Sequence, residues 1–257
     1  MSLPLLGAGM ATDGFDPLSI SGLQFWVDAN DSATLYTDST LTTLAVSDSD
    51  VIGGWKDKSG NSRNALQNDG AKKPLLKTAF LNGRNVVSFG ATRQELTTTA
   101  SWSIGLYTAF IVRKFNTLSS SRFLYWAGNP AGSLNSLGHG FTVAETEYIQ
   151  IASSSYLVLV SGISSTAWGQ VTDQQASLSG LTRLKFRQNG SNIAGTFVGT
   201  LDPTVPQSFP LTIGGLGHAF NFPLDGYISE FLIYDSVLSG SDILLVEAYL
   251  KAKWGTP

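Results

Sequence analysis

Short runs in which apolar and polar residues alternate recur along most of this chain, separated by turn-forming residues at roughly ten-residue spacing. Clear examples are "LYTAFIVRKF" (106–115), "RFLYWAG" (122–128) and "YLVLVSG" (156–162). In "TRLKFRQNGSNIAGTFVG" (182–199), Asn189 and Gly190 supply the positive φ values that a tight hairpin turn requires. This pattern predicts an all-β fold, either a sandwich or a barrel.

The segment "LDGYISEFLIYDSVLSGSDILLVEAYLKAKWG" (224–255) changes from strand-like alternation to helical spacing. In its first half both faces are apolar, which predicts an interior strand. Strict alternation places Ile228, Leu232 and Tyr234 on one face and Phe231 and Ile233 on the other. Glu230 then shares a face with Ile228 and Leu232, which favours a structural, hydrogen-bonded carboxylate.

The second half of this segment predicts a short C-terminal helix. Ser239 and Asp242 have the spacing of a capping box, and Gly255 is a typical helix stop. One helical stripe is apolar: Ile243, Val246, Leu250 and Trp254. We therefore expect the helix to pack against the sandwich.

The chain has 257 residues, which suits a single large β domain; we place it at 21–257, after an extended arm at 1–20. Charged residues make up only 14%, against about 25% in average soluble proteins. Net charge is −3 with scattered Lys and Arg, which argues against nucleic-acid binding. The absence of cysteine excludes disulfides and thiolate sites. No segment resembles a secretory signal or a membrane-inserting helix.

Several segments, in order, resemble concanavalin A-like lectin/glucanase domains of the laminin G-like type. They are "LQFWVDAND" (23–31), "VIGGWKDKSGNSRNALQ" (51–67), "NGRNVVSFGA" (82–91) and the ending, with Tyr234-Asp235, Leu238-Ser239, Tyr249-Leu250 and Lys253-Trp254-Gly255. The resemblance implies a jelly-roll sandwich of two antiparallel sheets. It implies no single function, because such domains serve as lectins, glycosidases, adhesion modules and structural proteins.

This chain is a small stand-alone domain of that type with a Gly-rich arm, and as such it loosely resembles proteins that tailed bacteriophages carry on their virions. It implies a virion structural, decoration or adhesion protein that residues 1–20 anchor to neighbouring capsid or tail subunits. Under this hypothesis the protein is made in the cytoplasm, belongs to a homo-oligomer or larger assembly, and is displayed at the virion surface.

A glycoside hydrolase is the first alternative. Glycosidases of this fold carry acids at alternate positions of one strand, and "AETEY" offers Glu145 and Glu147. The third acid of the usual pattern is absent, so we predict that the protein is not an enzyme. His139 and His218 follow glycines in turn-like contexts, and we expect both to be exposed in loops.

Calcium is a candidate ligand of two loops. "DANDS" offers Asp28, Asn30 and Asp31, and "KDKSGN" offers Asp57. Oxygen-bearing side chains at alternating positions suit calcium, although the same residues are standard material for Asx turns.

Glycan binding is the remaining candidate activity, and it would direct the protein to cell-surface glycans. Sugar sites combine aromatic faces with short polar side chains, and the candidates are Trp102, Trp168, Trp126 and Tyr148. Trp102 and Trp168 lie in Ser/Thr-rich contexts, where we expect exposure, whereas Trp26, Trp55 and Trp254 are expected in the core. Arg183, Lys185 and Arg187 share one strand face, which suits either an anionic partner or solvent. A free carbohydrate-binding module is the second alternative.

Overall fold

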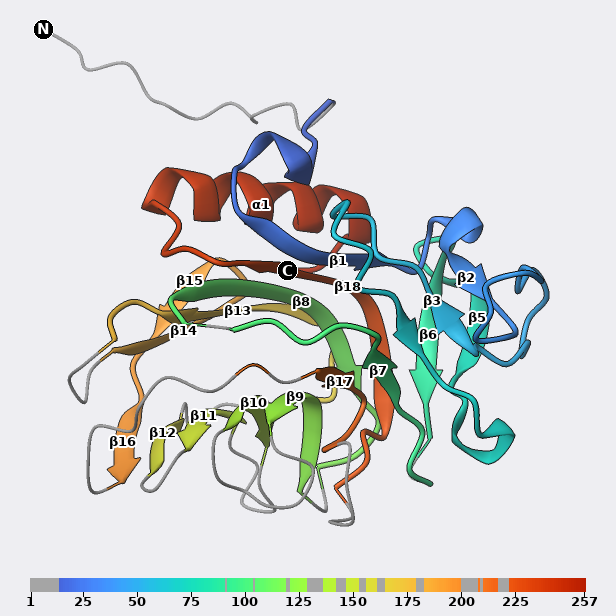
Figure 1. The fold of residues 1–257 in the computed structure, drawn as a ribbon. Helices are drawn as coiled ribbons and strands as arrows, with labels where there is room; N and C mark the ends of the chain where they lie inside the picture. Colours follow the sequence, from blue (N-terminus) through green and yellow to red (C-terminus); the bar gives the residue numbers. More distant parts are fainter. Residues whose placement is uncertain are drawn as a thin grey trace, which may run out of the picture.

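The structure, a computed structural model, describes residues 14–90, 92–103, 105–118, 121–128, 136–141, 147–152, 156–160, 165–178, 183–199, 208, 210–216 and 222–257. Its strands form two stacked antiparallel sheets, and the helix α1 (Gly240–Trp254) lies on the outer side of one of them (Figure 1). The predicted all-β sandwich with a short C-terminal helix is confirmed. Residues 1–13 of the predicted N-terminal arm lie outside the described part.

The sheet that carries the helix, called the helix-side sheet, has the strand order β15-β14-β13-β8-β18-β6-β5, with β1 also paired to β18. Its strands are β1 (Leu23–Asp28), β5 (Leu75–Leu81), β6 (Arg84–Phe89), β8 (Tyr107–Phe115), β13 (Gly169–Gln175), β14 (Leu184–Gln188), β15 (Ser191–Ile193) and β18 (Gly226–Tyr234). Because β18 has partners on both sides, the predicted interior strand is confirmed.

The second sheet, called the far sheet, has the order β16-β12-β11-β10-β9-β17-β7-β4-β3-β2. Its strands are β2 (Leu35–Tyr36), β3 (Gly54–Trp55), β4 (Ala65–Leu66), β7 (Leu96–Thr98), β9 (Arg122–Gly128), β10 (Ser136–Phe141), β11 (Glu147–Ala152), β12 (Tyr156–Val160), β16 (Thr196–Gly199) and β17 (Leu211–Ile213). Short 3₁₀ turns occupy η1 (Pro17–Ser19), η2 (Ser32–Thr34) and η3 (Gly70–Lys72).

Two apolar layers result from this arrangement. The larger lies between the sheets, and a second lies between the helix-side sheet and α1. The second layer contains the whole predicted stripe of α1: Ile243, Val246, Leu250 and Trp254. Ser239 caps the helix by accepting from the Asp242 N–H at 3.1 Å, and Gly255 ends it in the left-handed conformation. The sequence therefore predicted the helix, its caps and its buried face correctly.

Strand β18 differs from the predicted alternation at one place. A bulge at Ser229 shifts the pairing with β8 between Ile228 and Glu230. Ile228 therefore faces the core between the sheets, together with Phe231 and Ile233, and not the side of Leu232 and Tyr234 as expected. An extra residue in one strand moves the side chains of all later residues to the opposite face of the sheet. The periodicity of the sequence alone does not reveal such a bulge.

Residues 14–20 pack on the domain itself. Phe15 contacts the ring of Tyr249 on α1 at a centroid distance of 5.6 Å, and the Tyr234 hydroxyl donates to the Pro17 carbonyl at 3.1 Å. This part of the predicted arm is thus a folded segment that covers the helix.

Candidate functional site

Three aromatic side chains line up on the outer face of the helix-side sheet. Tyr227 stacks with Phe80 at a centroid distance of 4.7 Å and lies 5.8 Å from Trp168. The Lys114 Nζ lies 5.9 Å from the centre of the Tyr227 ring. Phe80 is 44% exposed, and the others are half-buried. We call Trp168, Lys114, Tyr227 and Phe80 the aromatic row. Neighbouring exposed aromatic surfaces of this kind are typical of binding sites.

Strand register builds most of this row. Tyr227 of β18 pairs with Lys114 of β8 on one side and with Ser88 of β6 on the other. Trp168 directly precedes Gly169, whose partner on β8 is Arg113, so Trp168 stands beside Lys114. Helix α1 leaves the row open because its last residue, Trp254, lies over Glu230, three residues along β18 from Tyr227.

Phe80 reaches the row through an irregular stretch of β5. The pairing of β5 with β6 shifts between Lys77 and Leu81, and Ala79 has a φ of 50°. This distortion brings Phe80 over Tyr227. Sequence reasoning missed Phe80 and Tyr227. Strict alternation places Tyr227 on the face of Phe231 and Ile233, and only the bulge at Ser229 turns it outward.

The four predicted glycan-binding residues fall in different places. Trp168 lies in the aromatic row. Trp102 is only 8% exposed and stacks against Phe25 in the main core, so the expectation that it is exposed is wrong. Trp126 is buried on the outer side of the far sheet, against Phe123. The side chain of Tyr148 lies outside the described residues. The predicted core residues Trp26, Trp55 and Trp254 are buried as expected.

The predicted calcium ligands are occupied by cations of the protein itself. Lys58 Nζ lies 3.2 Å from Asp28 and 2.7 Å from Asp31, and Lys253 Nζ lies 2.7 Å from Asp28. Burial alone raises the pKa of Asp31, but Lys58 outweighs it and lowers that pKa. The structure does not support calcium at these carboxylates, because two ammonium groups already neutralise them.

The other calcium candidates act as turn residues. The carboxylate of Asp57 accepts from the backbone N–H groups of Trp26, Ser59 and Arg63 at 2.9–3.0 Å. Asn30 accepts from the Asn85 N–H at 3.4 Å. Among the described residues, no group of three or more His, Cys, Asp or Glu side chains could hold a metal ion.

Glu230 organises a buried cluster beneath α1. Its Oε1 accepts from Trp26 Nε1 and from the Tyr249 hydroxyl, both at 2.8 Å. Its Oε2 lies 2.6 Å from Trp254 Nε1 and 2.8 Å from Lys253 Nζ. Burial and the neighbouring charge of Asp28 raise the pKa of Glu230. The predicted structural role of Glu230 is confirmed, and the tryptophan and lysine of the C-terminal motif are its partners. We call these five residues the Glu230 cluster.

A second buried cluster joins the two sheets, and we call it the inter-sheet cluster. Arg113 of β8 forms a forked ion pair with Glu147 of β11, with distances of 2.6–2.9 Å. His139 of β10 places Nδ1 2.6 Å from Asp173 of β13, whose Oδ2 also accepts from the Tyr125 hydroxyl at 3.1 Å. All four charged side chains are fully buried.

The charges in this cluster stabilise one another. Burial by itself lowers the pKa of His139, but Asp173 and Glu147 outweigh it and raise that pKa to about 9. Burial raises the pKa of Glu147, while Arg113 and His139 outweigh it and lower the net value. The expectation that His139 is exposed in a loop is wrong, because it lies on an inward-facing position of β10; His218 lies outside the described residues.

These contacts bear on the hydrolase alternative. Glu147 points into the sandwich and is bound to Arg113, so it does not lie in an open cleft where a sugar could reach it. Glu145 lies outside the described residues. A carboxylate held by a guanidinium and without access to solvent is suited to holding the sheets together.

The basic stripe on β14 is largely neutralised. Arg187 forms ion pairs with Glu247 of α1 at 2.8 Å, and Arg183 is buried and donates to the Leu178 carbonyl. Lys185 alone of the three is exposed. In the part of the chain that the structure describes, these three residues therefore leave only Lys185 as an exposed cation and do not form a continuous basic surface.

The fold defines a class: a two-sheet antiparallel β-sandwich with one helix on its outer side. No protein-family model matches the chain, and no curated protein matches it. Among solved structures, domain 4 of AbnA, a GH43 extracellular arabinanase from Geobacillus stearothermophilus in complex with arabinotriose, is similar with a TM-score of 0.58 and 12% identity. The match covers 88% of this chain and 98% of that one.

Two further structures are similar. Trypanosoma rangeli sialidase matches with a TM-score of 0.53 and 14% identity over 92% of this chain, which spans 34% of the sialidase. The CBM40 domain of Ruminococcus gnavus IT-sialidase, bound to α2,3-sialyllactose, matches with a TM-score of 0.45 and 16% identity over 56% of this chain and 83% of that one. At 12% and 14% identity, the likeness to the arabinanase domain and to the Trypanosoma rangeli sialidase shows the fold alone. Within the described residues, no helix is long and apolar enough to cross a membrane.

Proposed function

We propose that this chain is a non-enzymatic glycan-binding β-sandwich and that the aromatic row is its binding surface. The observation that carries the proposal is the line of neighbouring aromatic rings at Trp168, Tyr227 and Phe80, left partly open to solvent beyond the end of α1. The solved neighbour that covers most of both chains was determined with a bound oligosaccharide, which supports the same class of ligand.

The chemistry of the row suits a sugar. Sugar rings present faces of C–H groups, which pack favourably on aromatic rings. Lys114 beside Tyr227 and the half-buried Ser88 across from it supply hydrogen-bond donors for ring hydroxyls. A row of successive rings suits a chain of two or three sugars lying across the strands.

The absence of catalysis is part of the proposal. The aromatic row holds no carboxylate, and Glu147, one of the two carboxylates of the hydrolase alternative, is bound to Arg113 in the interior. A pair of carboxylates flanking the sugar is what glycoside hydrolysis ordinarily needs.

The location of the protein on a virion is a further part of the proposal. The sequence resemblance to virion proteins motivates display on a particle, with the arm at residues 1–20 as the anchor; residues 14–20 pack on the domain, so 1–13 are the part to remove in a test. Incorporation of a variant without residues 1–13 into its parent particle at the normal level would contradict this anchoring.

A glycan array with the purified protein tests the binding surface. We expect binding that Trp168→Ala and Tyr227→Ala each weaken by about tenfold or more, because buried aromatic anchors carry most of an interface energy. Phe80→Ala should weaken it less, because Phe80 is exposed whereas Trp168 and Tyr227 are half-buried, and exposed side chains contribute less binding energy. The matched control is Phe222→Ala, another partly exposed aromatic residue, which contacts Phe123 on the outer side of the far sheet.

The outcomes separate the candidate faces. Loss of binding in Phe222→Ala with normal binding in Trp168→Ala would move the site to the face that carries Trp126. Binding to no glycan would contradict the proposed function itself. Circular dichroism of each variant shows whether the sandwich remains folded.

A further inference from the structure

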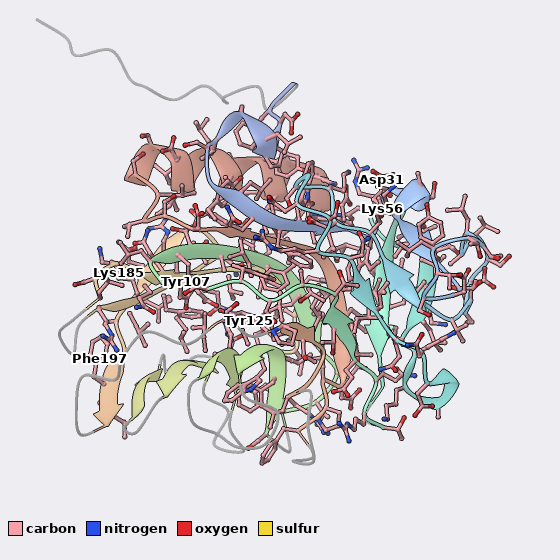
Figure 2. The ribbon with its side chains drawn as sticks, in the orientation of Figure 1. Asp31, Lys56, Tyr107, Tyr125, Lys185 and Phe197 are labelled. Carbon is pink, nitrogen blue, oxygen red and sulfur yellow. The ribbon has the colours of Figure 1, made fainter. Side chains whose placement is uncertain are left out.

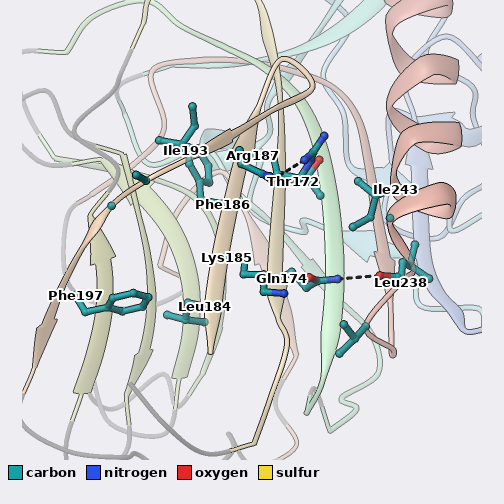
Figure 3. Close-up of a pocket in the computed structure, with 15 residues that line it drawn as sticks. Thr172, Gln174, Leu184, Lys185, Phe186, Arg187, Ile193, Phe197, Leu238 and Ile243 are labelled. Atoms are coloured by element: carbon teal, nitrogen blue, oxygen red, sulfur yellow. Dashed lines mark hydrogen bonds between the residues drawn. The ribbon is translucent and has the colours of Figure 1, made fainter. Parts of the chain in front are cut away.

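A pocket of about 610 Å³ opens at one end of the sandwich, beside strand β14 (Figure 3). Its lining comes from β13, from β14, from β15 and the chain that runs on into β16, and from the start of α1 with the segment before it. This pocket is separate from the aromatic row, and none of the row's residues lines it. Figure 2 places Lys185 and Phe197, which line it, on the side of the molecule opposite Lys56.

Strand β14 has an incomplete partner along this pocket. Strand β15 pairs only with Phe186–Gln188, and after Ile193 the chain leaves the helix-side sheet to form β16 in the far sheet. Leu184 and Lys185 are paired with β13 on one side, and no described strand flanks them on the other. Figure 3 shows the two chain segments diverging around Leu184 and Phe197.

The direction of the backbone groups follows from the hydrogen bonds of β14. The Ala176 N–H donates to the Arg183 carbonyl at 2.7 Å, and the Asn189 N–H donates to the Gln170 carbonyl at 3.0 Å. Odd-numbered residues of β14 therefore bond toward β13, and even-numbered ones bond outward, as alternation in an antiparallel sheet requires. The N–H and C=O of Leu184 thus point away from β13, into the space beside β14 that β15 no longer occupies.

The inner and outer sides of this space beside β14 differ in chemistry. On the inner side, Leu184, Phe186 and Phe197 form an apolar wall. On the outer side lie Val237, 38% exposed, and the ammonium of Lys185, which has no ion-pair partner among the described residues. Arg187 carries no free charge there because Glu247 neutralises it.

We propose that this edge of β14 binds an extended peptide of a partner protein, which adds a strand to the helix-side sheet. An exposed strand edge is a ready template for such pairing, and flanking pockets select alternate side chains. The peptide places apolar residues against Leu184 and Phe197 and an acidic residue opposite Lys185. The partner is therefore a segment of alternating apolar and acidic residues.

Fluorescently labelled, capped Val-Glu-Val-Glu-Val is the probe, with Val-Lys-Val-Lys-Val as its charge-reversed control. Fluorescence anisotropy with the full chain should show saturable binding of the glutamate peptide and a preference for it of about fivefold, the scale of an exposed ion pair. Lys185→Glu should reverse this preference. Lys56→Glu, at an exposed lysine remote from the pocket, should leave it unchanged.

Backbone methylation tests the strand pairing without any change to the protein. In an antiparallel pairing with β14, residues whose side chains face the same side as Leu184 also direct their N–H groups at β14. N-methylation of the valines should therefore weaken binding by about tenfold, the scale of a lost hydrogen bond. N-methylation of the glutamates, whose N–H groups face away, should have little effect. Equal effects of the two methylations, no reversal by Lys185→Glu, or no saturation at millimolar peptide would each overturn the proposal.

Discussion

The carboxylates of Glu230 and Glu147 are both fully buried, yet their surroundings differ in origin and in completeness. Both oxygens of Glu230 are bonded, and most of the donors come from one helix. Glu147 belongs to a cluster assembled from four strands of two sheets. In that cluster Arg113 Nη1, His139 Nε2 and Asp173 Oδ1 have no hydrogen-bond partner within the described part of the chain.

This difference separates two uses of buried charge. The Glu230 cluster attaches a helix to the outside of a sheet, with two indole N–H groups that carry no net charge. The inter-sheet cluster holds two sheets in register through full charges, and removing one member of such a cluster leaves another uncompensated. We therefore expect the inter-sheet cluster to be the more sensitive of the two to substitution and to pH.

The largest expected effect is that of Arg113→Met. It removes the guanidinium that is bound to the buried Glu147 carboxylate, and we expect the free energy of unfolding to fall by about 3–5 kcal/mol. Urea denaturation measures this. The double variant Arg113→Met with Glu147→Leu removes both charges and should recover much of the loss. Equal stability of the single and double variants would show that the charge balance is unimportant there.

The next effect is a dependence on pH. Folding raises the pKa of His139 from 6.5 to about 9, so the stability it adds is complete below pH 6.5 and is lost as pH rises through about 9. The loss should approach about 3 kcal/mol, on the scale of 1.36 kcal/mol per pKa unit. Denaturation across this range measures it, and His139→Gln should flatten the curve. An unchanged slope in that variant would assign the dependence to other groups.

A smaller effect is expected for Glu230→Gln, at about 2 kcal/mol. The amide keeps one acceptor oxygen but turns an NH₂ group toward donors such as Trp254 Nε1 and Lys253 Nζ. Thermal unfolding of Glu230→Gln and Arg113→Met, measured side by side, gives the comparison directly. A greater loss in Glu230→Gln than in Arg113→Met would reverse the proposed ranking of the two clusters.

The smallest expected effect is that of calcium. Because Lys58 and Lys253 neutralise Asp28 and Asp31 beside the Glu230 cluster, neither calcium nor a chelator should move the unfolding midpoint. Differential scanning calorimetry tests this. Stabilisation by calcium that Asp28→Asn removes would show that the ion displaces the lysines.

The sequence predicted those parts of the fold whose signals are local. Capping by Ser239, the stop at Gly255 and the Asn189-Gly190 turn depend on a few neighbouring residues, and the structure confirms all three. The buried role of Glu230 was predictable because its strand is apolar on both faces.

The sites depend on contacts that are distant in the sequence. His139 follows a glycine, as in a turn, but the register of β10 places it inside the sandwich beside Asp173. Trp102 and Trp168 have similar polar neighbours, and only the fold decides that Trp102 stacks on Phe25 while Trp168 remains half-exposed. No local pattern indicates these outcomes, because each is set by which strands become neighbours.

The bulge at Ser229 has a consequence for how this domain can change over evolution. Tyr227 and Glu230 lie on the same side of β18 only because one extra residue stands between them. Substitutions along β18 alter one contact each, but deletion of a single residue here would turn either the aromatic row or the Glu230 cluster to the wrong face. This strand can therefore diverge in composition while its length is held constant. Descendants of this chain should differ in length in the loops long before they do so here.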